Sequence, residues 1–153
     1  MKDLSSEKSL AADEINNRLF FRFFQAANTL QTKSTQAVGV TTQQWSVLGA
    51  LSRPQARGGM SVGDLSRYLL VSRQNLAGVL NRLERDSLIE RATGEDDRRS
   101  RKVRLTGQGE KTWLKLGEPI HAFYDGALKG FSFDDRLEFF HYISRLQRNM
   151  AQL

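Results

Sequence analysis

The side chains best suited to chemistry lie in one stretch, SRQNLAGVLNRLERD, at residues 72–86. Arginine, glutamine and asparagine can hydrogen-bond to the base edges and phosphates of DNA, and this stretch holds several of them. Ala77 and Gly78 are small enough to let a helix backbone approach a DNA groove closely. The predicted DNA contacts are Ser72, Arg73, Gln74, Asn75, Ala77, Gly78, Asn81 and Arg82.

Gly78 needs a physical reason, because a glycine inside a helix costs about 1 kcal/mol relative to alanine. Close approach to DNA is one reason, and close packing against a neighbouring helix is the other. For Gln74 and Asn81 the alternative to base reading is an ordinary solvated helix surface. The residues alone leave these alternatives open.

A second group of cations follows in GEDDRRSR, at residues 94–101. An arginine at the tip of a hairpin can enter a minor groove and be held by its negative potential. Asp97 would hold the guanidinium of Arg99 in place there, whereas a merely soluble charged turn is the alternative. The predicted contacts at this tip are Asp97, Arg98, Arg99 and Arg101.

Two helices and a hairpin are expected to position these groups. The apolar residues of the 72–86 stretch recur at the spacing of one helix face, and Ser61 with Asp64 predicts the cap of a shorter helix before it. Ile89–Thr93 and Arg101–Leu105 have the composition of two short strands. The order predicts a mainly α fold, a winged helix-turn-helix lobe at 41–105 with a two-stranded β wing.

Long helices are expected on both sides of this lobe, at 13–38 and 106–153, within a single domain of 153 residues. They carry many aromatic residues, more than two short helices could cover, so much of this surface should be a dimer interface. Thr41 with Gln44 predicts a capping box after the first helix. Pro119 is expected to kink the later one, and the polar first dozen residues to form a loose arm.

Composition narrows the function class. The net charge is +6, and between Arg53 and Arg104 twelve basic residues face seven acidic ones, which favours a polyanion partner. The absence of cysteine excludes disulfides and thiol chemistry. No apolar run is long enough for a membrane span and the start does not resemble a signal peptide, so we expect no membrane partner and a cytoplasmic location.

Catalysis is not expected. His121 and His141 are the only histidines, both fall in expected helices, and the sequence has no catalytic triad, metal-ligand spacing or phosphate-binding glycine loop. We therefore predict no catalytic residues, no metal site and no cofactor.

Several motifs together resemble the MarR family of transcription regulators, over essentially the whole chain. They are TTQQWSVL at 41–48, the capped helix at 61–69, the 72–86 stretch with its NRLE, DRR at 97–99 and VRLTGQG at 103–109. The resemblance implies an obligate homodimer in which the first, fifth and sixth helices pack together, with two lobes meeting successive major grooves of a pseudo-palindromic operator. It places Asp97 and Arg99 in the tip contact and residues 72–82 in base and phosphate contacts. Ser87 departs from the family, which often has glycine there.

Members of the family often respond to aromatic acids or related anions, and in some branches to coenzyme A thioesters, bound between the dimerisation helices and the lobe. The resemblance thus implies a small aromatic or anionic effector. We expect its cleft near Phe20, Arg22, Phe24, Trp45, Arg53 and Trp113. Release of a repressor from its operator by the ligand is the default expectation, with activation left open because it depends on operator position. The alternative function is a non-specific architectural DNA-binding module or a protein-interaction module.

Overall fold

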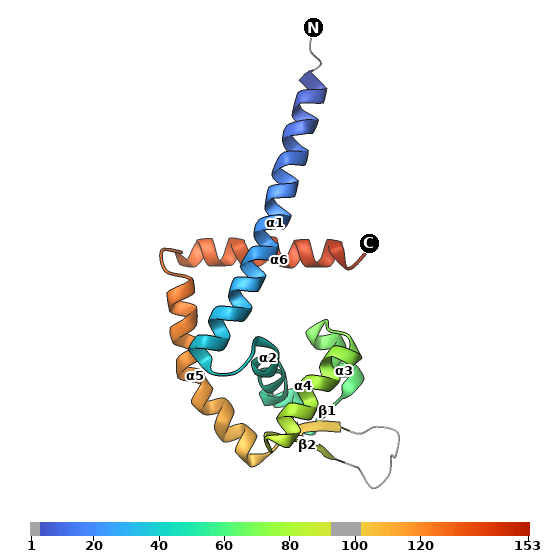
Figure 1. Ribbon diagram of the computed structural model, residues 1–153, viewed down its shortest axis with the longest axis vertical. Helices are drawn as coiled ribbons and strands as arrows, with labels where there is room; N and C mark the ends of the chain where they lie inside the picture. Colours follow the sequence, from blue (N-terminus) through green and yellow to red (C-terminus); the bar gives the residue numbers. More distant parts are fainter. Residues whose placement is uncertain (1–3, 93–101) are drawn as a thin grey trace.

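The computed structural model describes residues 4–92 and 102–153 (Figure 1). Long helices from both ends of the chain stand above a small lobe of short helices and strands. In chain order the elements are α1 (Leu4–Val38), α2 (Thr42–Ser52), a 3-10 turn η1 (Pro54–Ala56), β1 (Met60–Ser61), α3 (Val62–Leu69), α4 (Arg73–Arg85), β2 (Ile89–Ala92), β3 (Lys102–Leu105), α5 (Gly107–Ala127) and α6 (Phe133–Met150). The predicted mainly α fold with a winged helix-turn-helix is confirmed.

The core lies in the lobe, where α2, α3, α4 and the sheet meet. Its fully buried apolar side chains are Val47, Leu48, Leu65, Leu76, Leu80, Leu83, Ile89 and Val103. Burying each of the leucines contributes about 1.5–3 kcal/mol relative to leaving it exposed. The leucines of α4 all belong to the predicted apolar face, so this helix is held by its inner side and its outer side stays in solvent.

The two predicted wing strands, β2 and β3, pair in antiparallel fashion, which confirms the two-stranded wing, and among the described residues a third strand, β1, extends the sheet in the order β1-β3-β2. The third strand is the short β1, in which Met60 pairs with Val103. Gly59 before it has φ +86°, and a Cβ at that position would lie 2.9 Å from the Cβ of Lys102. A glycine here lets the chain turn and run close beside β3, in a segment whose composition predicts only a loop.

Local capping was read correctly from the sequence. Thr41 and Gln44 form a capping box in which the threonine Oγ1 accepts from the Gln44 N–H at 3.1 Å, and the Gln44 Oε1 accepts from the Thr41 N–H at 3.0 Å. The Ser61 hydroxyl caps α3 by accepting from the Asp64 N–H at 3.0 Å. These bonds satisfy N–H groups that have no partner inside the helix, so they fix where each helix begins.

The exit from α4 is a closed turn in spite of Ser87. This serine has φ +60°, and its N–H donates to Glu84 O at 2.9 Å while the Leu88 N–H donates to Leu83 O at 2.9 Å. Such a pair of bonds is the Schellman ending that glycine usually makes. The Thr106 hydroxyl adds a third bond by donating to the Ser87 carbonyl at 2.6 Å, so the start of α5 holds the turn in place.

The structure explains why a glycine, Gly109, follows Thr106 by three residues in the VRLTGQG motif. The Thr106 N–H donates to Leu88 O at 3.1 Å, and its hydroxyl accepts from the Gly109 N–H at 2.9 Å. A Cβ on Gly109 would lie 1.9 Å from that same Leu88 oxygen, a distance that no side chain could occupy. The first turn of α5 therefore packs directly on the backbone between α4 and β2.

The long helices differ from the lobe in being largely exposed. α1 packs along α5, and both carry the few residues that join them to the lobe core, among them Val38 and Ile120. α6 has no buried residue and crosses the path of α1 in Figure 1. α5 continues through Pro119 as one helix along a curved path (Figure 1).

α1 begins at Leu4, so the expectation of a loose arm before Asp13 was wrong. The residues that precede Asp13 are polar but include Glu, Lys, Leu and Ala, which are good helix formers.

Candidate nucleic-acid interface

The outer side of α4 presents the predicted base-reading residues. Every predicted contact on residues 72–82 is solvent-exposed, and the leucines that fall between them face the core. Gln74, Gly78, Asn81 and Arg85 share one helix face, because they are three or four residues apart. The Ser72 hydroxyl accepts from the Asn75 N–H at 3.1 Å, so that side chain caps the helix.

Gly78 faces open space. Within the described part of the chain, no atom lies within 4 Å of the position that a Cβ on Gly78 would occupy. Packing against a neighbouring helix in the lobe therefore does not account for this glycine. Close approach of DNA to the backbone of α4 remains the prediction for this glycine.

Cations gather where α3 and α4 begin. The Arg73 guanidinium lies over Gly63, where an added Cβ would come within 2.8 Å of its Nη2. Arg67 is paired with Asp64, whose pKa is held below its ordinary value first by the Ser61 hydroxyl and then by that guanidinium. Asp64 thus remains ionised at neutral pH and partly offsets the charge of Arg67.

Asn81 is bound by a residue that the sequence reasoning missed. Arg91, on β2, donates from its Nη2 to the Asn81 Oδ1 at 2.7 Å, and its Nε lies 3.3 Å from a carboxylate oxygen of Glu84. Both partners are on α4, so Arg91 links a strand of the wing to the outer face of that helix. The spacing of residues in the sequence does not predict this contact, because it joins a helix and a strand that are separated by a turn.

The wing is described only at its base. Asp97, Arg98, Arg99 and Arg101 lie outside the described residues, and so does the proposed grip of Asp97 on Arg99. At the base, the register pairs Glu90 with Arg104, and the Arg104 Nε donates to a Glu90 carboxylate oxygen at 2.6 Å. This cross-strand pair is half exposed and is worth at most about 1 kcal/mol.

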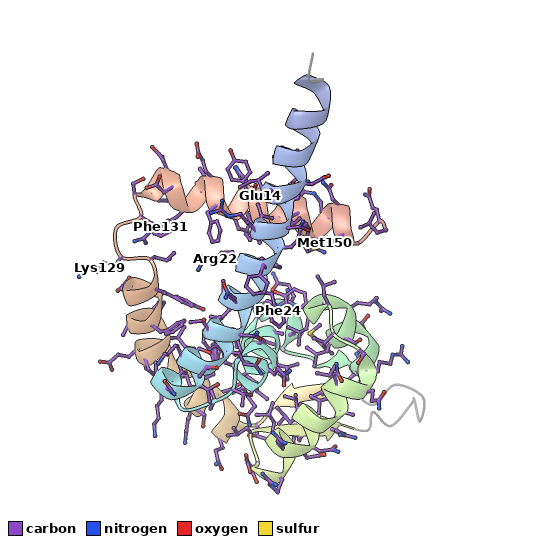
Figure 2. All side chains as sticks on the ribbon, turned by 45° about the horizontal axis from the view of Figure 1, so that its top comes forward. Glu14, Arg22, Phe24, Lys129, Phe131 and Met150 are labelled. Atoms are coloured by element: carbon purple, nitrogen blue, oxygen red, sulfur yellow. The ribbon has the colours of Figure 1, made fainter. Side chains whose placement is uncertain are left out.

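The residues predicted to form an effector cleft are dispersed. Arg22 lines an open groove of about 700 Å³ between α1 and α5, together with Thr29, Lys33 and Phe123. In Figure 2, Arg22 leaves α1 toward the side of α5, whereas Phe24 points toward the lobe. Phe20 and Phe24 are 49% and 63% exposed and do not line this groove.

The remaining three predicted residues are engaged elsewhere. Trp45 packs edge-on against Phe123 with 6.2 Å between the ring centres, and Trp113 lies against Gly49 of α2. The Arg53 guanidinium lies 3.7 Å from the centre of the Tyr68 ring, on the α3 side of the lobe. The structure thus brings Trp45 to the edge of the groove, through Phe123, and does not bring Arg53 to it.

Other chemistry is not indicated by the described residues. In residues 4–92 and 102–153, no group of three His, Cys, Asp or Glu residues is arranged to hold a metal ion, and both histidines are exposed. None of the helices described is long and apolar enough to cross a membrane.

Comparison with known proteins gives a consistent result. A sequence model of the MarR family matches residues 38–100. The chain is 51% identical over 144 residues to the transcriptional activatory protein BadR of Rhodopseudomonas palustris, which covers 92% of this chain and 82% of BadR. Among solved structures, a MarR/EmrR family regulator from Acinetobacter superposes with a TM-score of 0.79 at 21% identity, covering 91% of this chain and 99% of the other. The structure of NadR in complex with 4-hydroxyphenylacetate superposes with a TM-score of 0.63 at 26% identity, covering 82% of this chain and 89% of NadR.

Proposed function

This chain belongs to the MarR family, and from that premise we propose that it is a sequence-specific regulator that binds a pseudo-palindromic DNA operator as a homodimer and is controlled by a small aromatic anion. As a family member it is a transcription regulator and not an enzyme. The observation that carries the proposal is the outer face of α4, where hydrogen-bonding side chains surround a glycine with open space above it.

The surface area of one protomer supports a homodimer. The chain exposes 11914 Å², whereas a compact monomer of 17.4 kDa exposes about 7,900 Å². The excess, about 4,000 Å² per protomer, is larger than the share of about 1,000–2,500 Å² that each partner commonly buries in an obligate dimer. Much of it is apolar surface on α1 and α6, including Phe21, Phe24 and Phe140.

The groove between α1 and α5 supports an anionic aromatic ligand. Arg22 and Lys33 supply positive charge along α1, while Leu30 and Phe123 supply apolar lining. A groove of this volume is in the range of small-molecule sites. The complex of NadR with 4-hydroxyphenylacetate adds the precedent of an aromatic acid in a related regulator. A coenzyme A thioester would need only its acyl part inside the groove.

We propose repression as the default outcome, because a dimer that covers a promoter excludes polymerase. BadR is described as activatory. The same kind of protein would activate transcription if its operator lay upstream of the promoter. In either case the ligand acts by favouring a lobe spacing that no longer fits the operator, and the loss of DNA affinity equals its differential binding to the two states. Acting on chromosomal DNA, the protein would work in the cytoplasm.

A competition gel shift tests DNA specificity. The purified protein is titrated on the region upstream of its own gene, with unlabelled random DNA in excess and with the salt concentration varied. We expect tight binding that survives the competitor and weakens as salt rises. Gln74→Ala should weaken it, whereas Gln108→Ala, at an exposed glutamine on α5, should not. Equal competition by random DNA would indicate the alternative, an architectural or protein-interaction module.

Calorimetry tests the effector. Benzoate, 4-hydroxyphenylacetate and benzoyl-coenzyme A are titrated into the protein and into Arg22→Gln. The matched control is Arg18→Gln, one turn earlier on α1, where an exposed arginine lies 4.0 Å from Glu14 and outside the groove. We expect heat with at least one probe, reduced in Arg22→Gln alone. Unchanged affinity in Arg22→Gln would remove the groove as the site.

A further inference from the structure

The contact between Arg91 and Asn81 has consequences for which base the recognition helix reads. An asparagine side chain has one acceptor oxygen and one amide nitrogen with two hydrogens. Reading adenine needs both, because the adenine edge in the major groove offers an acceptor at N7 beside a donor at N6. In this structure the Arg91 guanidinium engages one lone pair of the Asn81 oxygen, at 2.7 Å, and turns that oxygen toward β2.

The direction of the Asn81 amide follows from chemistry. A guanidinium has only donors, so the atom of Asn81 that faces Arg91 must be the oxygen. A rotated amide would set its N–H groups against the N–H groups of Arg91. The amide nitrogen therefore lies on the branch that points away from Arg91, and within residues 4–92 and 102–153 its two hydrogens have no acceptor.

Arg91 is itself held firmly enough to impose this orientation. Its side chain is only 30% exposed, and its Nε is closed to solvent and lies 3.3 Å from a carboxylate oxygen of Glu84, an ion pair without a hydrogen bond from that atom. The backbone of Arg91 is fixed in β2, where Arg91 pairs with the buried residue Val103 of β3. The guanidinium is thus fixed from both sides, by the strand that carries it and by the acid on α4.

Resting on the proposed function, we infer that Arg91 is a specificity-determining positioning residue: it holds Asn81 as a hydrogen-bond donor, so that α4 favours guanine or thymine over adenine at the base facing Asn81. Guanine offers two acceptors, O6 and N7, and thymine offers O4. Adenine offers these donors N7 alone, because its N6 hydrogens cannot accept, so the two-bond contact that a free asparagine makes to adenine is lost. Arg91 itself need not touch DNA.

Selection from a random duplex library tests this inference without a known operator. Bound sequences are recovered for the full-length protein, Asn81→Ala, Arg91→Ala, Arg91→Lys and the double variant, and base preferences are compared position by position. For the parent we expect one position, lost in Asn81→Ala, where guanine or thymine is favoured over adenine by about tenfold. In Arg91→Ala the preference at that position should move toward adenine. Arg91→Lys, which keeps a donor, should retain it, and the double variant should match Asn81→Ala.

Two outcomes would overturn the inference. One is an adenine preference in the parent protein that disappears in Asn81→Ala, and the other is a base preference at that position that Arg91→Ala leaves unchanged. A merely structural role for Arg91 would lower affinity equally at all positions, which this readout separates from a change at one. If the parent selects no sequence at all, the proposed function fails and this inference fails with it.

Discussion

At the scale of single residues, Gly78 is the position of α4 that bears most directly on its proposed role in binding DNA. Gly78 sits in the middle of the helix, on its exposed face, where an alanine would be the more stable choice by about 1 kcal/mol. Packing within the described part of the lobe does not require a glycine at this position. The missing side chain leaves the helix backbone accessible from outside.

Gly78→Ala is expected to stabilise the fold by about 0.5–1 kcal/mol and to weaken DNA binding by about tenfold, because the added methyl group holds the helix away from the groove. Urea unfolding at a fixed protein concentration and fluorescence anisotropy with DNA measure the two effects. Gly117→Ala on α5 is the control, since its Cβ would also meet no described atom within 4 Å. Unchanged DNA affinity in Gly78→Ala would contradict the account.

The exposed face of α4 could be predicted from the sequence, because helical spacing separates its leucines from its polar residues. The role of Arg91 could not, since its bond to Asn81 crosses from a strand to a helix and depends on how the two pack. Arg53 shows the same limit. As a free cation it is a reasonable anion ligand, but tertiary packing stacks it on Tyr68.

At the scale of elements, the junction of α4, β2 and α5 fixes the wing to the recognition helix. Its parts are the Schellman turn at Ser87, the capping hydroxyl of Thr106 and the bare backbone of Gly109. Caps could be predicted from the sequence because they join residues three apart. β1 could not, because two residues form a strand only when β3 lies beside them.

Gly109→Ala is expected to destabilise the protein by at least about 3 kcal/mol, since the methyl group would overlap the Leu88 carbonyl oxygen and force α5 away from the lobe. Gly107→Ala, at the first position of the same helix, has no described atom within 4 Å of its Cβ and should be neutral or slightly stabilising. Urea unfolding followed by circular dichroism compares the two. Equal stability of both variants would show that the junction is not close-packed.

At the scale of the whole molecule, the long helices leave large apolar side chains exposed to solvent in one protomer. α6 has no buried residue, and its apolar side chains, such as Phe140 at 64% exposure, have nothing to cover them within one protomer. The aromatic content of the terminal helices indicated this from the sequence. Which residues face the partner could not be predicted, because helical spacing does not fix how two copies pack.

Phe140→Asp is expected to weaken the dimer, because a carboxylate placed in an apolar interface loses its hydration without gaining a partner. Sedimentation at low micromolar concentration should give about twice the 17.4 kDa chain mass for the parent protein and a shift toward one chain for the variant. Leu70→Asp, an equally large change at a residue 68% exposed on the lobe, should remain dimeric. A parent protein that sediments as a single chain would contradict the predicted interface.

In the proposed dimer, two copies of α4 read one DNA site together. Hydroxyl-radical footprinting on the upstream region of the gene tests it most directly, because the pattern reports both the grooves occupied and their spacing. We expect two protected segments related by approximate two-fold symmetry, one helical turn of about 10 base pairs apart or a small multiple of it, on one face of the duplex. A single protected segment, or uniform protection that spreads with concentration, would contradict it.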